Sequence, residues 1–303
     1  MPVGRITRII GGFYYINDHE GRTITGVPRG KLRADGLVVG DVVEFQLIPP
    51  DQGVIEGIHR RRNFLKRPLV SNITQVGLVF AHKNPDYNYL LIDRFLVMLE
   101  AYNLPTVIIF NKTDLVDEKT AEGNAEPYRK IGYAVLCTST KSLVGKDSLL
   151  TSLRGETTTL AGPSGVGKSA LINLIAPDLA QETGAVSAKI GRGRHTTREV
   201  RLLPLPEGNG FIFDTPGFTQ LDLDFIPPEG LSACFPEFSR FEQDCRFQGC
   251  LHQQEPDCAV KAAVTAGQID AWRYEHYLTF LAELKNRTNR QNPRTRGNRK
   301  QRS

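Results

Sequence analysis

A glycine-rich stretch has the composition and spacing of a phosphate-binding loop. Its pattern is G-x-x-x-x-G-K-[S/T], in which consecutive backbone N–H groups turn inward around a phosphate. Lys168 is expected to reach the β- and γ-phosphates of a nucleotide, and the Ser169 hydroxyl to ligate Mg²⁺. The stretch consists of Gly162, Pro163, Ser164, Gly165, Val166, Gly167, Lys168 and Ser169, and Ala170 follows it.

The flanking residues give this loop the context that the pattern requires. Residues 157–161 are a short apolar and β-branched run that predicts a strand, and residues 170–175 are typical of the first turns of a helix. A helix N-terminus after the loop adds a dipole that favours bound phosphate. We therefore interpret the stretch as a P-loop rather than as an ordinary glycine-rich turn.

A second nucleotide signature follows a predicted strand at residues 106–110. It has the form N-K-x-D and consists of Asn111, Lys112, Thr113 and Asp114. A carboxylate in the plane of a purine accepts hydrogen bonds from N1–H and from the exocyclic N2 amine, and only guanine offers both. Asp114 is therefore predicted to select GTP over ATP.

Neighbouring side chains complete the predicted base pocket. Asn111 is expected to bind the base edge and to brace the P-loop, while the Lys112 stem lies along the base. Thr138 and Ser139 follow the next predicted strand and are expected to form the second base-contacting loop. Ordinary turn chemistry is the alternative explanation for hydroxyl residues at that point.

A third signature, D-x-x-G, comes directly after the apolar run at residues 211–213. Asp214 is expected to hold Mg²⁺ through water, and the Gly217 N–H to sense the γ-phosphate. Many Ras-like GTPases place a water-orienting glutamine after this glycine, whereas Phe218 stands here and cannot orient water. Hydrolysis by the chain alone is therefore predicted to be slow, with the polar group supplied by a partner or by His195.

A basic loop at residues 191–198 separates the P-loop from D-x-x-G. Either Thr196 or Thr197 is predicted to close on Mg²⁺ when the γ-phosphate is present, and we name Thr197 as the magnesium ligand. Such a loop would be a switch. The alternative is an ordinary basic surface loop.

The order of the signatures differs from that of an ordinary G protein. There the P-loop comes first and N-K-x-D last, whereas here N-K-x-D stands at residues 111–114 and the P-loop at residues 162–169. The same sheet can form when the chain enters it elsewhere, because strands need only the right neighbours. We therefore predict a circularly permuted GTPase domain whose D-x-x-G leads directly into the C-terminal region.

Cysteines cluster with a histidine in that region. Cys245, Cys250, His252 and Cys258 have the spacing C-x4-C-x-H-x5-C. A Cys₃His set with every position filled by protein is typical of one structural Zn²⁺. Random clustering is the alternative, because this spacing is less familiar than C-x2-C.

The elements around these residues can be predicted from their patterns. Residues 1–62 contain five short β-rich runs separated by turn residues. This pattern predicts a small β-barrel of the size of an OB-fold. An SH3-like barrel is nearly as compatible with it. A basic linker is expected at residues 60–68. Alternating strands and helices then predict a mostly parallel sheet covered on both faces. The predicted strands are 76–81, 106–110, 133–137, 157–161, 200–205 and 211–213, and the helices are 90–102 and 118–131.

The predicted architecture is therefore multidomain. Its parts are an OB-fold-like β-barrel (1–62), a circularly permuted α/β P-loop GTPase domain (63–221), a small α-helical zinc-binding module (222–284) and a basic, disordered tail (285–303). In the module, one helix face is expected to pack on the zinc site. That face consists of Ile269, Trp272, Tyr277, Phe280, Leu281 and Leu284.

Charge and apolar content indicate the compartment and the partners. The net charge of +5 conceals a basic end, because residues 285–303 hold eight lysines and arginines and no acid. Such tails often meet nucleic acid, and a merely solubilising tail is the alternative. No run of about 18 apolar residues predicts a membrane span. We expect a cytoplasmic monomer without a membrane partner.

Taken in order, the barrel, the permuted signatures and the Cys₃His cluster resemble the bacterial ribosome small-subunit-dependent GTPase A family. The resemblance covers nearly the whole chain, and Phe218 fits a branch with a hydrophobic residue in place of the glutamine. It implies GTP and GDP as ligands with Mg²⁺, one Zn²⁺, contact with 16S rRNA, and GTP hydrolysis stimulated by the 30S subunit during its late maturation.

Three other functions stay open from the residues alone. The first is an RNA- or ribosome-binding module that uses GTP as a regulatory ligand with little turnover, which Phe218 favours. The second is an ATP-dependent P-loop kinase or transporter subunit, against which Asp114 argues. The third is a permuted GTPase that acts on the large ribosomal subunit.

Overall fold

The computed structural model describes the chain apart from six short segments, and the described residues form two compact units. The segments left out are residues 34–35, 67, 178–199, 207–209, 219–221 and 292–303. The first unit spans 1–87, 104–129 and 133–220, and the second spans 88–103, 130–132 and 221–303. Among the described residues, every helix is too short or too polar to span a bilayer. The boundaries of the four predicted domains stay predictions.

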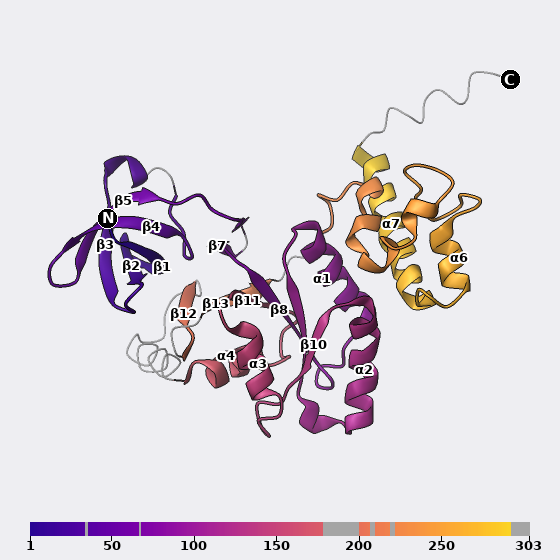
Figure 1. The fold of residues 1–303 in the computed structure, drawn as a ribbon, viewed down its shortest axis with the longest axis horizontal. Helices are drawn as coiled ribbons and strands as arrows, with labels where there is room; N and C mark the ends of the chain where they lie inside the picture. The colour runs from indigo at the N-terminus through magenta and orange to yellow at the C-terminus, as the bar shows by residue number, and fades with distance from the viewer. Residues whose placement is uncertain (34–35, 67, 178–199, 207–209, 219–221, 292–303) are drawn as a thin grey trace, which may run out of the picture. The chain divides into compact units, whose positions relative to one another are not determined.

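A closed five-stranded β-barrel forms the N-terminal part of the first unit (Figure 1). The strand order is β1-β2-β3-β5-β4, and β1 pairs with β4 to close the barrel. Successive side chains of a strand point to opposite faces, so apolar residues alternate and line the inside. The predicted barrel is confirmed, and it is OB-like. Its strands are β1 (Val3–Ile10), β2 (Phe13–Asp18), β3 (Thr23–Pro28), β4 (Val42–Ile48) and β5 (Gln52–Ile58).

The segment predicted as a basic linker, residues 60–68, contains folded structure. β6 (Phe64–Lys66) pairs with β7 (Leu69–Ser71) in a short antiparallel hairpin. Arg61 donates from Nε and Nη2 to the two oxygens of the buried Asp41 carboxylate, at 2.7 and 2.8 Å. The linker prediction is therefore wrong in part. A basic run is typical of solvated chain, and the sequence does not reveal that one of its arginines has a buried partner.

A six-stranded sheet forms the rest of the first unit. Its order is β10-β9-β8-β11-β13-β12, and only β12 is antiparallel to its neighbour. The predicted mostly parallel sheet is confirmed. The P-loop strand β11 lies between β8 and β13, although β8 and β9 precede it in the chain. The strands are β8 (Gln75–Ala81), β9 (Thr106–Asn111), β10 (Ala134–Cys137), β11 (Thr157–Ala161), β12 (Arg201–Pro204) and β13 (Phe211–Phe218).

Helices cover both faces of this sheet. α3 and α4 share one buried apolar cluster with Ile109 of β9. The next residue, Phe110, points to the opposite face, where its ring centroid lies 6.4 Å from that of Tyr128 in α2. The sheet is therefore buried on both sides, which explains the continuous apolar runs of its strands. These helices are α2 (Glu118–Ile131), α3 (Lys146–Leu153) and α4 (Lys168–Ile175).

The second unit is helical. It contains α1 (Tyr89–Ala101), α6 (Ala259–Thr265), α7 (Ala271–Gln291) and short 3₁₀ turns between residues 228 and 244. Asn88 caps α1, because its side chain accepts a hydrogen bond from the Leu91 N–H at 3.2 Å. The core consists of fully buried side chains from the turns and from α7, namely Leu231, Phe235, Phe238, Tyr277, Phe280 and Leu281.

Two predictions for the C-terminal region need correction. Trp272 was placed on the buried face of the helix, but it is half-buried and its neighbour Arg273 is buried instead, at 1 % exposure. The predicted tail at 285–303 also begins inside α7, which continues to Gln291. Helical spacing alone does not predict the buried face correctly, because Arg273, which has buried carboxylate partners, takes a core position.

Candidate nucleotide and metal sites

The nucleotide signatures converge at one edge of the sheet. The carboxyl ends of parallel strands meet at one edge, which is where open α/β sheets bind ligands. N-K-x-D lies at the end of β9, Thr138 and Ser139 follow β10, and the P-loop follows β11. Because β8 alone separates β9 from β11, signatures that lie far apart in the sequence become neighbours.

Asn111 joins the base-recognition signature to the P-loop. Its Nδ2 donates to the Val166 carbonyl at 2.9 Å, and its Oδ1 accepts from the Thr138 hydroxyl at 3.2 Å. The residue is 1 % exposed, so both ends of its amide need these partners. This geometry supports the predicted bracing of the P-loop. Base binding by Asn111 stays a prediction.

Lys112 makes a second link between the two signatures. Its ammonium donates to the Gly165 carbonyl at 2.7 Å and to the Asn84 carbonyl. The Lys112 backbone is left-handed, with φ of 61°, and this conformation directs the turn after β9. The contact with Asn84 could not be predicted from the sequence, because Asn84 contributes a backbone carbonyl.

Ser139 fixes the carboxylate that is predicted to read guanine. Its hydroxyl donates to Asp114 Oδ1 at 2.6 Å and accepts from the Lys141 and Ser142 N–H groups at 3.2 and 3.1 Å. The Lys141 ammonium lies 3.9 Å from Asp114 Oδ2. The predicted second loop therefore does lie beside Asp114. Lys141 was missed, because a lysine after a turn is commonplace.

Lys168 is held inside the P-loop. Its ammonium donates to the carbonyls of Gly162 and Pro163 at 2.8 and 2.6 Å, and burial lowers its pKa. A phosphate would compete for this ammonium, because an ionised acceptor forms a stronger hydrogen bond than a neutral carbonyl. Ser169 and Ala170 are exposed in the first turn of α4, whose N-cap provides no side-chain cap. The N–H groups of this turn therefore suit an anionic ligand.

Replacing Gly167 by alanine is expected to weaken GTP binding at least about tenfold. A tenfold rise in Kd corresponds to a loss of about 1.4 kcal/mol of binding free energy. Gly167 has φ of 104°, and an added Cβ would lie 2.3 Å from Asn111 Nδ2. The variant must shift either the P-loop or the Asn111 amide. Titration with a fluorescent GTP analogue measures the change. Gly123→Ala is the matched control, because nothing lies within 4 Å of its Cβ position. Wild-type affinity in Gly167→Ala would contradict the bracing role.

The D-x-x-G signature lies inside a strand rather than after one. We predicted a strand end at residue 213, but β13 continues to Phe218. Thr159 of β11 pairs with Phe213 and Ala161 pairs with Phe218, so residues 214–217 form an irregularity in the pairing. Such irregularities are common beside functional sites. The roles of Asp214 and Gly217 stay predictions.

The predicted switch lies outside the described residues. This applies to His195, Thr196 and Thr197 and to the whole loop 191–198. The part of the tail from residue 292 onward also lies outside them. Their predicted roles therefore stay predictions.

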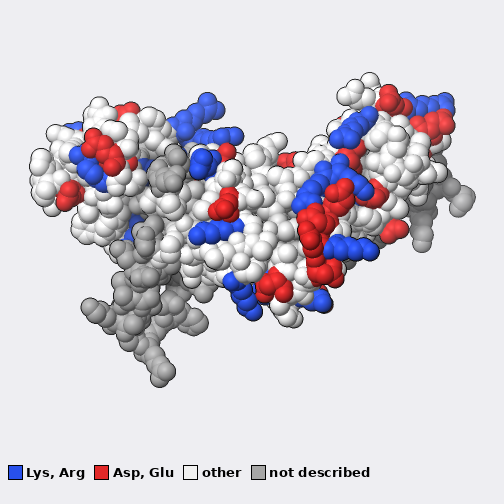
Figure 2. Space-filling model, turned by 60° about the horizontal axis from the view of Figure 1, so that its bottom comes forward, with Lys and Arg blue, Asp and Glu red and all other residues white. Residues whose placement is uncertain are grey.

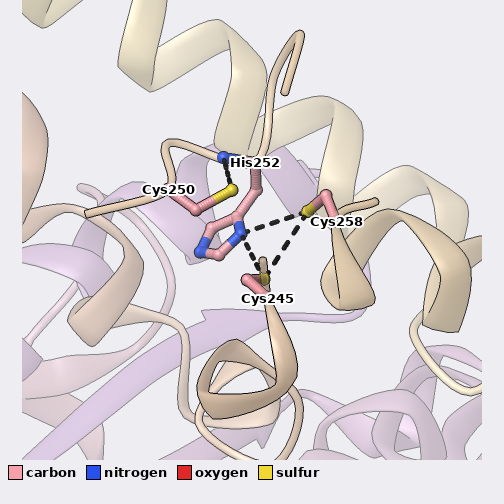
Figure 3. Close-up of side chains that lie close together, drawn as sticks. All are labelled: Cys245, Cys250, His252 and Cys258. Atoms are coloured by element: carbon pink, nitrogen blue, oxygen red, sulfur yellow. Dashed lines mark hydrogen bonds between the residues drawn. The ribbon is translucent and has the colours of Figure 1, made fainter. Parts of the chain in front are cut away.

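Cys245, Cys250, His252 and Cys258 come together as the sequence predicts (Figure 3), with ligand atoms within 4.8 Å of one another. The Cys245 and Cys258 sulfurs are 3.9 Å apart, and His252 Nδ1 lies 3.6 and 3.3 Å from them. Tetrahedral Zn²⁺, with Zn–S of about 2.3 Å and Zn–N of about 2.0–2.1 Å, requires separations of about 3.8 and 3.5 Å. The donor set therefore fits one Zn²⁺, with Nδ1 as the histidine donor.

Burial favours the neutral form of three of these four donors. Burial raises the pKa of the Cys250 thiol to about 12, raises that of Cys258 and lowers that of His252. A neutral imidazole is the form that ligates a metal. The Cys250 and Cys258 thiols would stay protonated on their own, and the charge of a bound cation would reverse that preference.

Comparisons with known proteins agree with this geometry. The family model described as RsgA GTPase matches residues 58–224, and the RsgA N-terminal domain model matches residues 3–55. A relative from Shouchella clausii, named "Small ribosomal subunit biogenesis GTPase RsgA", is 43% identical over 295 residues, covering 96% of this chain and 100% of the relative. A relative of the same name from Moorella thermoacetica is 48% identical over 283 residues, covering 93% and 97%.

Solved structures show the same architecture. The chain is similar to YloQ, described as a circularly permuted GTPase, with a TM-score of 0.80, 37% identity, and coverage of 95% of this chain and 96% of that one. It is similar to YjeQ from Thermotoga maritima with a TM-score of 0.79, 36% identity, and coverage of 93% and 98%. The predicted circular permutation is therefore confirmed.

Proposed function

The chain belongs to the RsgA GTPase family, and on that basis we propose that it hydrolyses GTP in the biogenesis of the small ribosomal subunit. The observation that carries this proposal is the hydrogen bond from Asn111 to the Val166 carbonyl, which connects the base-recognition signature to the P-loop. A nucleotide held there would have its base near Asp114 and its phosphates at the loop. The name of the relatives supports the biological role.

In this proposal the P-loop stabilises the charge that develops on the phosphates. Lys168 exchanges its loop carbonyls for the β- and γ-oxygens, and the N–H groups of the loop donate to the same oxygens. Water attacks the γ-phosphorus as the bond to the β–γ bridging oxygen breaks, and Gly217 N–H contacts the γ-phosphate. Mg²⁺, when bound, neutralises phosphate charge, and the proposed residues that hold it are Ser169, Thr197 and Asp214.

The polar group that orients water is proposed to depend on the ribosomal particle. Phe218 has no such group, and His195 is the candidate within the chain. The barrel, the zinc module and the basic tail are proposed to dock on 16S rRNA. On the face drawn in Figure 2, basic and acidic side chains are interspersed. In this proposal the basic residues at 285–303 supply much of the phosphate contact, and the protein acts as a cytoplasmic monomer.

We also infer that the Cys₃His cluster holds one structural Zn²⁺. Cys245, Cys250, His252 and Cys258 would supply all four ligands of a tetrahedral ion, which would leave no position for a substrate or a water molecule. A closed set of this kind stabilises the surrounding fold and performs no chemistry of its own.

GTP turnover is expected to rise at least tenfold with 30S particles and not with 50S particles, because a partner group that completes such a site is worth about 10³–10⁵ in rate. Phosphate release is measured for the purified protein alone and with 30S, 50S or 70S particles, and ATP is the nucleotide control. Equal, slow turnover with every particle would refute the stimulation by the small subunit. Equal use of ATP would refute guanine selection.

A further inference from the structure

The histidine ligand of the metal cluster lies in an unfavourable backbone conformation. His252 has φ of 51°, in the left-handed region. A residue with a Cβ adopts this region only where its surroundings fix it, because the carbonyl of the same residue crowds the side chain. This conformation allows Nδ1 to face the Cys245 and Cys258 sulfurs. Some part of the fold must therefore hold the loop around His252.

One carboxylate accepts hydrogen bonds from backbone N–H groups on both sides of His252. Glu255 Oε1 accepts from Leu251 N at 3.1 Å, and Oε2 accepts from Gln253 N at 2.9 Å and from Gln254 N at 3.0 Å. Burial acts to raise the pKa of Glu255, but hydrogen bonds from backbone N–H groups outweigh it and lower the pKa to about 2. The group is therefore an ionised acceptor at neutral pH, which makes these hydrogen bonds strong.

Two tyrosines hold the carbonyl side of the same loop. The Tyr274 hydroxyl donates to the His252 carbonyl at 2.6 Å, and the Tyr277 hydroxyl donates to the Leu251 carbonyl at 2.8 Å. Both tyrosines belong to α7, which supplies a rigid support. The loop is thus fixed from its N–H side by Glu255 and from its carbonyl side by α7.

We propose that Glu255 is a positioning residue of the zinc site, which holds His252 in its ligating conformation before the metal binds. The inference rests on the zinc site proposed above. With Glu255 in place, Zn²⁺ meets a preformed loop. Without it, the loop relaxes from the left-handed conformation, and part of the binding free energy is spent on restoring it. Partners behind metal ligands commonly change metal affinity 10–100-fold.

The geometry explains why a carboxylate is required at this position. Glutamine has the same shape, but one end of its amide is an NH₂ group that donates. In Glu255→Gln this NH₂ group would face either the Leu251 N–H or the pair from Gln253 and Gln254. At least one loop N–H therefore loses its acceptor, because two donors cannot pair.

The test compares zinc affinity in three full-length variants. Apo-protein is prepared under reducing conditions, and the Kd for Zn²⁺ is measured by competition with a chromophoric chelator. Glu255→Gln is expected to bind zinc about 10–100-fold more weakly than wild type. Tyr274→Phe, which removes one carbonyl contact, is expected to show a smaller loss. Asp257→Asn is the matched control, because it also removes one negative charge next to a proposed ligand, Cys258. The Asp257 carboxylate is exposed and pairs with Arg246.

Each outcome decides the proposal. Absence of zinc binding in the wild-type protein would overturn the zinc site itself and leave the GTPase proposal untouched. Equal losses in Glu255→Gln and Asp257→Asn would assign the effect to charge alone and reject positioning. A Glu255→Gln protein that stays unfolded in saturating zinc would show a general structural role and also reject it. The ligand-field spectrum of the Co²⁺-loaded protein provides a second readout. If this spectrum changes in Glu255→Gln and not in Asp257→Asn, the change would support a displaced His252 ligand.

Discussion

Replacing Asp114 by asparagine is expected to change the preferred nucleotide from GTP to xanthosine triphosphate. The carboxylate accepts from N1–H and from the N2 amine of guanine, whereas the asparagine NH₂ would face that amine as a second donor. Xanthine has a carbonyl at that position and can accept from the new amide. Mispaired groups of this kind change discrimination by up to about 10⁴–10⁵ when buried. Asp114 is part-exposed, with 19% side-chain exposure, so we expect a loss of GTP affinity of at least about 10²-fold.

The measurement is the Kd for GTP, xanthosine triphosphate and ATP in wild type and variant. Asp117→Asn is the matched control, because this substitution makes the same change of charge three residues away. Asp117 accepts a hydrogen bond from Thr120 N at 2.7 Å. The Asp117→Asn substitution should leave the nucleotide order unchanged. If Asp114→Asn kept wild-type GTP affinity, the base would have to lie elsewhere than beside Asp114 and Ser139.

Removing the guanidinium of Arg273 is expected to destabilise the second unit severely. Arg273 is 1 % exposed and pairs with Asp93 at 2.6 Å, and its Nε donates to Glu237 at 2.6 Å. In Arg273→Met the buried Glu237 would lose this counter-charge, and Asp93 would lose the guanidinium and keep its contact with His276. Breaking a buried ion pair in this way costs about 3–5 kcal/mol. For a unit of about 100 residues, in which 1 kcal/mol shifts Tm by about 4–8 °C, that corresponds to a fall in Tm of about 12–40 °C.

Thermal unfolding followed by circular dichroism tests this prediction. Arg94→Met is the matched control, because Arg94 pairs with Glu283 where both side chains are partly exposed, at 22% and 33%. Exposed pairs contribute about 0–1 kcal/mol, so its Tm should change little. Similar Tm values for Arg273→Met and wild type would mean that the buried cluster contributes little to stability.

The convergence of the nucleotide signatures was largely predictable, because each signature consists of side chains at fixed spacing in a short loop after a strand. The P-loop and N-K-x-D each combine glycines, a lysine or a carboxylate with a preceding apolar strand, and few other folds use that combination. The sequence could not show that Lys112 donates to the Asn84 carbonyl, nor that Lys141 approaches Asp114. Backbone acceptors and exposed lysines have no distinctive pattern, so contacts of this kind appear only in three dimensions.

The C-terminal unit was less predictable for a different reason. Helical periodicity placed Trp272 inward, while Arg273 takes the buried position. Hydrophobic patterning assumes that charged residues face solvent, and a buried ion cluster breaks that assumption. Cys245, Cys250, His252 and Cys258 were predicted as ligands from their types and spacing, and the structure brings them together. Glu255 was not, because an acid beside a proline is ordinary surface composition.

The position of α1 in the chain limits how the protein can be divided. α1 lies between β8 and β9 in sequence, yet it belongs to the second unit, and its Asp93 lies against Arg273 and His276 of α7 at 2.6 Å each. A shortened protein that ends after β13 would therefore retain a buried acid whose basic partners had been removed, together with an uncovered helix. The C-terminal region and α1 therefore form one folding unit, so a deletion that removes α7 would also expose the packed face of α1 and impair solubility.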